Sequence, residues 1–172
     1  NNNNGTLTNT PTQHPTGGPV TTALPSGGPC LNFDGSDDYV NLSTSLGSYF
    51  HGPKQFTISL WVKFDVLTRN EYLFSARDTF NNNKHLHIYK FSNNIVRFGF
   101  HNNALDSNGT LDSNWHHITV TYGAGRVRKI YLDGVLDKSN VSSSDLDLSP
   151  TAEVLIGKRS SESYSVFDGK MS

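Results

Sequence analysis

The carboxylates of this chain lack the spacing that would hydrolyse a glycosidic bond. Glycoside hydrolysis needs two carboxyl groups that face each other, ~5–5.5 Å apart in retaining enzymes. The chain has three glutamates, Glu71, Glu153 and Glu162, and none has an aspartate two positions away. Asp145 and Asp147 are two residues apart, but the leucine after each one indicates a loop that touches a core. We therefore expect that the protein is not an enzyme.

Histidines are the second group whose spacing could support chemistry. His85 and His87 would share one face of a strand, because side chains alternate between the faces of a strand. Two imidazoles placed in this way can bind Zn²⁺ with a third ligand, which the sequence does not identify. The neighbours His116 and His117 would point to opposite faces and cannot chelate as a pair. We favour structural or surface roles for all four.

Polar side chains in two loops form the candidate ligand-binding set. Sugar sites combine an aromatic ring with Asn, Asp and Arg side chains that hydrogen bond to hydroxyl groups. The candidates in these loops are Arg77, Asp78, Asn81, Asn82, Asn102 and Asn103. The alternative is that these loops are only solvated. Because loops often carry function on a rigid scaffold, we keep both interpretations.

Composition excludes two classes of partner. The 172 residues include 14 Lys and Arg against 15 Asp and Glu, for a net charge of −1. Nucleic-acid binders normally carry a clustered basic excess, so we expect no nucleic-acid partner. No stretch approaches the ~20 apolar residues of a membrane helix, so we expect no membrane insertion.

Side-chain types also indicate the fold class. The chain contains 18 Asn, 20 Ser and 15 Thr but few good helix formers, which is typical of an all-β protein with long polar loops. The clearest strand is Phe56–Phe64, in which every second residue, from Phe56 to Phe64, is apolar. Further strands are expected at residues 30–33, 39–42, 71–76, 86–91, 95–100, 115–122, 127–132, 135–136, 153–157 and 166–171. Short strands separated by turns predict a two-sheet antiparallel β-sandwich.

The first part of the chain differs from the rest. Residues 1–29 contain no periodic apolar segment and are rich in Asn, Thr, Gly and Pro, which predicts an extended arm or loop that belongs to the domain. The sandwich itself would occupy residues 30–172. A length of 172 residues suits one domain.

Several short motifs, taken in order, resemble a known family. They are 31–35 (LNFDG), 37–40 (DDYV), 56–62 (FTISLWV), 115–118 (WHHI), 130–134 (IYLDG), 156–157 (IG) and 167–171 (FDGKM). Their order and spacing resemble the laminin-G-like domain of the concanavalin A-like lectin/glucanase superfamily, in its bacterial and pentraxin-like form. The resemblance spans nearly the whole chain and implies a concanavalin A-like jelly roll. It also implies one further strand at each end, which flanking sequence or a neighbouring chain would supply.

The resemblance suggests a metal and a role for the cysteine. Domains of this family often bind Ca²⁺, which prefers oxygen ligands. The implied ligands are Asp37, Asp38 and Asp168, with Asn and backbone carbonyls of residues 1–5. The alternative is that Asp37 and Asp168 cap turns through their own backbone. Cys30 occupies the position of a small buried residue, where a thiol without a cationic neighbour is inert.

These observations lead to one expected function and one alternative. We expect a non-catalytic carbohydrate-binding or adhesion module of a larger extracellular or surface protein. Its partners would be glycans or surface glycoproteins. The alternative is a structural decoration or assembly domain that contacts flanking domains or neighbouring protomers through its sheet edges.

Overall fold

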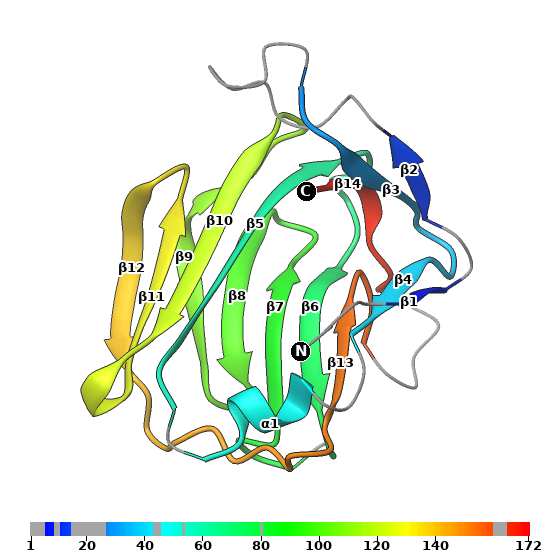
Figure 1. Ribbon diagram of the computed structural model, residues 1–172. Coiled ribbons are helices and arrows are strands. Elements are labelled where there is room, and N and C mark those ends of the chain that lie inside the picture. The colour runs from blue at the N-terminus through cyan, green and yellow to red at the C-terminus, as the bar shows by residue number, and fades with distance from the viewer. Residues whose placement is uncertain are drawn as a thin grey trace.

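Two antiparallel sheets of seven strands each form the protein, as the computed structural model shows (Figure 1). It describes residues 6–8, 11–14, 27–42, 46–52, 54–79, 81–159 and 165–172. The first sheet has the order β1 (Thr6–Thr8), β4 (Tyr39–Asn41), β13 (Glu153–Ile156), β6 (Glu71–Arg77), β7 (His85–Lys90), β8 (Ile95–Phe100) and β9 (Ala104–Thr110). The second has the order β12 (Val135–Val141), β11 (Val127–Leu132), β10 (His116–Tyr122), β5 (Phe56–Phe64), β14 (Asp168–Met171), β3 (Cys30–Asp34) and β2 (Thr12–His14). This confirms the predicted β-sandwich.

Helix is almost absent from the described chain. One turn of α-helix, α1 (Gly47–Phe50), lies at the lower end of the sandwich in Figure 1, and one 3-10 turn, η2 (Ala124–Arg126), joins β10 to β11. No helix among the described residues is long and apolar enough to span a membrane.

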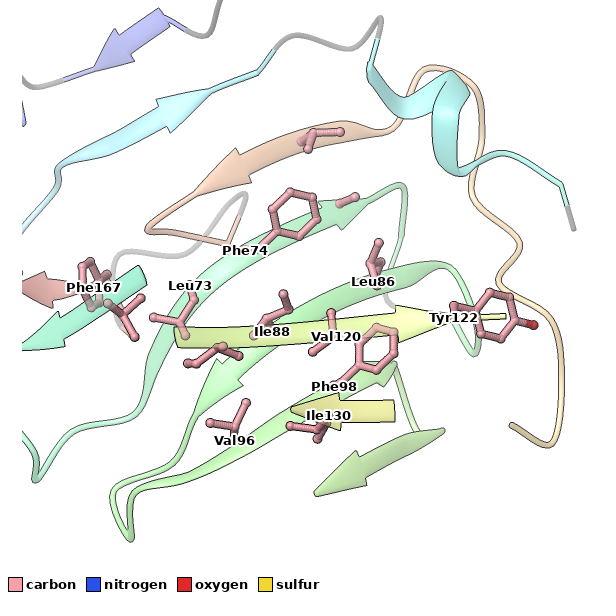
Figure 2. Close-up of a cluster of buried hydrophobic side chains, with 14 of the residues drawn as sticks. Leu73, Phe74, Leu86, Ile88, Val96, Phe98, Val120, Tyr122, Ile130 and Phe167 are labelled. Carbon is pink, nitrogen blue, oxygen red and sulfur yellow. The ribbon is translucent and has the colours of Figure 1, made fainter. Parts of the chain in front are cut away.

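Alternation along the strands produces the core between the sheets. In β5, Val62 and Phe64 are fully buried and face inward, while Thr57 and Ser59 are exposed on the outer face. Strands of the first sheet supply the opposite wall, and Figure 2 shows the side chains of the two walls in contact with one another. The labelled members of this cluster are Leu73, Phe74, Leu86, Ile88, Val96, Phe98, Val120, Tyr122, Ile130 and Phe167.

Three strands were not predicted from the sequence, because they lack an apolar period. β9 has the sequence ALDSNGT and pairs with β8, with a bulge between Ile95 and Arg97. β1 and β2 lie within the predicted arm, where they form outer strands of the first and second sheets. Each of these edge strands contributes at most one apolar residue to the core, so pairing with the neighbouring strand rather than an apolar period decides that it forms.

Candidate functional site

A hollow of about 530 Å³ opens on the outer face of the first sheet, away from the core. Strands β6, β7, β8 and β9 form its floor, and the loop after β8 and the segment after β13 border it. We call it the outer hollow. The described residues that line it are Tyr72, His85, His87, Tyr89, Phe91, Arg97, His101, Asn102, Ala104 and Arg159.

Aromatic rings form one part of the outer hollow. Along β7 and just beyond it, every second residue from His85 to Phe91 carries a ring, and Leu86 and Ile88 between them point into the core. The ring centroids of Tyr72 and Tyr89 lie 4.5 Å apart, and those of Tyr89 and Phe91 lie 5.0 Å apart. Tyr89 and Phe91 are half-buried, and rings exposed in this way can stack on the apolar face of a sugar, while Tyr72 is buried beneath them.

Two arginines accompany the rings. The Arg97 guanidinium lies 4.6 Å from the centroid of Phe91 and makes two hydrogen bonds to Asp106, of 2.7 and 2.8 Å. The Arg159 guanidinium lies 4.9 Å from the centroid of Tyr72 and donates a hydrogen bond of 2.7 Å to the Tyr72 hydroxyl. Both guanidinium groups are therefore held in fixed orientations beside aromatic faces.

Two buried histidines complete the floor and are neutral at pH 7. Burial, followed by the positive charges around the rings, lowers the pKa of His85 to about 2 and that of His87 to about 3. A neutral imidazole can both donate and accept a hydrogen bond. A Cβ on Gly99 would lie 2.8 Å from His87 Nε2, so the absence of a side chain at Gly99 lets this ring pack closely against β8.

The histidines do not gather around a point where a metal could bind. His85 and His87 share the outer face as predicted, and their ring centroids are 4.7 Å apart. Within the part of the chain that the structure describes, however, the one cluster with metal-ligand spacing contains aspartates alone. His116 instead contacts Asp112 and Asp133 with its two ring nitrogens.

The predicted ligand-binding residues divide between two places. Asn102 lines the outer hollow, and its side-chain amide donates a hydrogen bond of 2.9 Å to Asn82. Arg77, Asp78 and Asn81 line a second hollow of about 550 Å³, formed with the segment before β13, which we call the loop hollow. The prediction that these residues bind a ligand stays a prediction.

Two of the predicted residues hold loops together. Asp78 accepts a hydrogen bond from the Ser149 backbone N–H. The Asn103 side-chain amide donates to both Asn83 and Ser142, and the Asn103 backbone carbonyl accepts a hydrogen bond of 2.7 Å from Arg128. These contacts explain why polar residues concentrate here: they satisfy buried backbone and side-chain groups where the loops meet.

An acidic cluster lies in the turn between β3 and β4. Carboxylate oxygens of Asp34, Asp37 and Asp38 lie within 4.8 Å of one another. Asp38 is only 4% exposed; one of its oxygens accepts the Asp34 N–H, and the other has no hydrogen-bond partner among the described residues. Burial, followed by repulsion from the other two carboxylates, raises the pKa of Asp38. An all-oxygen donor set with an unsatisfied buried oxygen fits Ca²⁺.

Asp168 lies opposite Asp34 in the pairing of β14 with β3, beside the acidic cluster, and its role as a metal ligand stays a prediction. Its carboxylate pairs with Arg69 at 3.2 Å, and the aspartate that joins Asp37 and Asp38 is Asp34. The suggested ligands from residues 1–5 lie outside the described residues. Cys30 is buried and free, as predicted, and burial raises the pKa of its thiol.

Sequence reasoning missed most of the outer hollow. Its signal was present as alternating rings at residues 85, 87, 89 and 91 on the side opposite the core residues. Outward positions of a surface strand are normally polar, so a run of rings there marks a surface that can bind a ligand.

Comparisons with known proteins agree with this architecture. The sequence profile of a laminin G-type family, described as the concanavalin A-like lectin/glucanases superfamily, matches residues 34–172. No curated protein matches the chain in sequence. Among solved structures, domain 4 of the extracellular arabinanase AbnA from Geobacillus stearothermophilus, solved with arabinotriose, has a TM-score of 0.68 at 17% identity, covering 97% of this chain and 78% of that one.

Two other solved structures share the fold. The carbohydrate-binding module CBM40 of the Ruminococcus gnavus IT-sialidase, bound to α2,6 sialyllactose, has a TM-score of 0.61 at 16% identity and covers 83% of this chain and 87% of that one. A pentraxin from Limulus polyphemus has a TM-score of 0.55 at 12% identity, with 83% and 72% covered. Since the family profile spans most of the chain and the jelly roll is common to all three structures, this protein belongs to the concanavalin A-like lectin/glucanases superfamily.

Proposed function

We propose that this chain is a non-catalytic carbohydrate-binding module whose ligand lies in the outer hollow. The observation that carries the proposal is the meeting of outward-facing rings with arginine, amide and imidazole groups in one cavity. Rings supply a stacking surface and the polar groups supply directed hydrogen bonds, which is the composition of a sugar site. Structures that share the fold include an arabinanase domain with arabinotriose and a module with sialyllactose.

Binding without hydrolysis is the second part of the proposal. None of the described residues that line the outer hollow is an aspartate or a glutamate. Hydrolysis needs two carboxyl groups that flank the glycosidic bond. A module of this kind would act outside the cell or on a surface, in a larger protein that uses it for attachment.

The test is a screen of oligosaccharide binding by the wild-type protein, followed by Tyr89→Ala. Removing the central ring should weaken binding at least about tenfold, a loss of ~1.4 kcal/mol. Tyr131→Ala is the matched control, because Tyr131 lies on the outer face of the second sheet, on β11. It should bind as the wild type does. Affinities by calorimetry and melting curves of each variant are the measurements.

Two results would contradict this site. Equal affinity of wild type and Tyr89→Ala would remove the outer hollow as the binding place. If Arg77→Ala or Asn82→Ala then abolished binding without changing the melting temperature, the loop residues predicted from the sequence would hold the ligand.

A structural Ca²⁺ is a second candidate, favoured by the buried and unsatisfied oxygen of Asp38. We propose that Asp34, Asp37 and Asp38 hold it and thereby pin the turn between β3 and β4. A ligand that binds only the folded state stabilises it by about 2.7 kcal/mol at a hundredfold excess over its dissociation constant. Calcium should therefore raise the melting temperature of the wild type by several degrees compared with chelator.

Asp38→Asn should lose this response, because one ligand charge and the buried oxygen are changed. Asp65→Asn, an exposed carboxylate outside the cluster, is the control and should keep it. Identical melting of the wild-type protein with calcium and with chelator would refute the metal proposal and leave the glycan proposal intact.

A further inference from the structure

The charge of the outer hollow distinguishes between classes of glycan. Among its described lining residues, Arg97 and Arg159 carry positive charge and no residue carries a negative one. Hydrogen-bonding groups are enough to bind a neutral sugar. Arginine guanidinium groups, in contrast, are well suited to bind anions such as carboxylate, phosphate or sulfate groups. This asymmetry is the starting point of the inference, which rests on the proposed function.

Arg97 is oriented for an anion by its neighbours. Its Nε and Nη2 atoms donate to the two oxygens of Asp106, and its plane lies beside the Phe91 ring. A guanidinium has five N–H donors, so this pair leaves both hydrogens of Nη1 and the second hydrogen of Nη2, a fork at the end of the side chain. None of the described residues accepts from Nη1. The Arg97 side chain is 36% exposed, so a ligand can reach this fork.

The electric field in the hollow favours negative charge. After burial, the positive charges of Arg97 and Arg159 contribute to the lowered pKa of His87, and Arg159 and Arg77 contribute to that of His85. On β9, the Asp106 carboxylate faces Arg97 and is already paired with it. Burial disfavours any charge, but the part of these shifts that comes from the arginines reflects positive charge, which stabilises an anion placed beside it.

A tight turn after β8 borders the hollow. His101 and Asn102 have left-handed backbone conformations, with φ of 47° and 54°, and a hydrogen bond of 2.8 Å from the Phe100 N–H to the Asn103 backbone carbonyl closes the turn. Positive φ at both central residues is what a two-residue hairpin of this type requires. The turn places Asn102 at the hollow, where its amide can hydrogen bond to a sugar hydroxyl.

We propose that the outer hollow binds an acidic glycan, whose carboxylate or sulfate group accepts hydrogen bonds from the free N–H groups at the end of the Arg97 side chain. In this arrangement Tyr89 and Phe91 contact the sugar ring, and Arg159 supplies a second positive charge. Asp106 acts as a positioning residue, because it fixes the plane of the Arg97 guanidinium and does not itself line the hollow.

Matched pairs of sugars test this proposal by calorimetry. The probes are methyl β-glucuronide against methyl β-glucoside, 3′-sialyllactose against lactose, and galactose 3-sulfate against galactose. We expect the charged member of at least one pair to bind at least about tenfold more tightly, and this preference to decrease at high salt. The carboxylate and sulfate pairs distinguish the two sources of negative charge.

Variants of Arg97 test whether this residue causes the preference for the acidic sugar. Arg97→Gln should abolish the preference for the acidic sugar, and Arg97→Lys, which keeps the charge but not the fork, should retain part of it. Lys129→Gln removes one charge from β11, in the second sheet, and should bind as the wild type does. Melting curves establish that each variant is folded.

Each other outcome has a defined meaning. Equal affinity for the acidic and neutral members of every pair would overturn this inference while leaving the proposed function in place. A preference for the acidic sugar that survives in Arg97→Gln would overturn the assignment to Arg97. No binding of any sugar by folded protein would overturn the inference and the proposed function together.

Discussion

At the scale of single residues, a fully buried ion pair links β6 to β7 within the first sheet, next to the start of β14. Lys90 Nζ lies 3.0 Å from a Glu71 oxygen, and both side chains are 0% exposed. The other Glu71 oxygen accepts the Asp168 N–H, and Lys90 also donates to the carbonyls of Leu67 and Arg69. Every group therefore has a specific partner, which is the condition under which a buried charge is tolerated.

Glu71 should make stability depend on pH in a defined direction. Burial raises the pKa of Glu71 to about 7, against the opposing effect of Lys90. A carboxyl group whose pKa is raised by folding adds stability below its unfolded pKa of 4.5, and this stability is lost as the pH rises through about 7. Glu71→Gln should remove this part of the pH dependence, because the glutamine amide is neutral at every pH.

Urea unfolding of both proteins between pH 4.5 and pH 8 measures the effect, because the difference between the two curves isolates Glu71. His85 and His87 act in the opposite sense below pH 6.5, because their lowered pKa values favour the unfolded state as it binds protons. The histidine contribution is the same in the wild type and in Glu71→Gln, so it cancels in the difference between the two curves. Parallel curves would show that Glu71 does not titrate in this range.

At the scale of elements, β14 depends on a glycine at its closest approach to β5. Gly169 has a φ of 144° and pairs with Phe64 on one side and Phe33 on the other. A Cβ on Gly169 would lie 2.1 Å from the Lys63 carbonyl oxygen, a backbone atom that cannot turn aside. The lack of a side chain at Gly169 therefore allows β14 to lie between β3 and β5, in the interior of the second sheet.

Gly169→Ala should therefore destabilise the fold by at least about 2 kcal/mol, combining backbone strain with overpacking. Gly134→Ala is the matched control, because Gly134 has a φ of 82° but no atom lies within 4 Å of its added Cβ. The control should cost only the strain, about 1 kcal/mol. Denaturant unfolding of the two variants measures both, and equal losses would show that the contact with Lys63 is unimportant.

At the scale of the whole molecule, the two faces of the sandwich have different characters. The outer face of the first sheet carries the ring-lined hollow, whereas that of the second carries exposed Thr57 and Ser59 and the Trp61 ring packed against His117. A third hollow, apolar and about 710 Å³, opens beside Ile58 and Leu60. β14 pairs with β5 along Val62–Phe64, with one further contact between Ser172 and Trp61.

That third hollow bears on the alternative of an assembly domain. Among the described residues, no strand pairs with the Phe56–Leu60 part of β5 on the β14 side. Unpaired strand edges beside apolar surface are where sheets accept further strands. The alternative function through sheet edges stays a prediction.

Much of the fold could be predicted because burial follows the period of the sequence. The alternation of β5 placed Val62 and Phe64 in the core, and the leucines at 146 and 148 were expected to touch it, as they do. The prediction failed for β9, whose polar sequence has no such period and pairs because β8 lies next to it. Whether a strand pairs depends on the strand beside it, and the periodicity of one segment carries no information about that neighbour.

The sequence by itself determined the fold class, the inner face of most strands and the family. A two-residue period and ordered motifs can be recognised in a sequence without knowing which residues are in contact. Only the tertiary structure decided the site. It brought Tyr72, Arg97 and Arg159, far apart in the chain, into one hollow, and separated Asn102 from Arg77. It also joined Asp34 to Asp37 and Asp38 and paired Asp168 with Arg69. Register between strands and the path of loops set these distances, and both arise from packing of the whole chain.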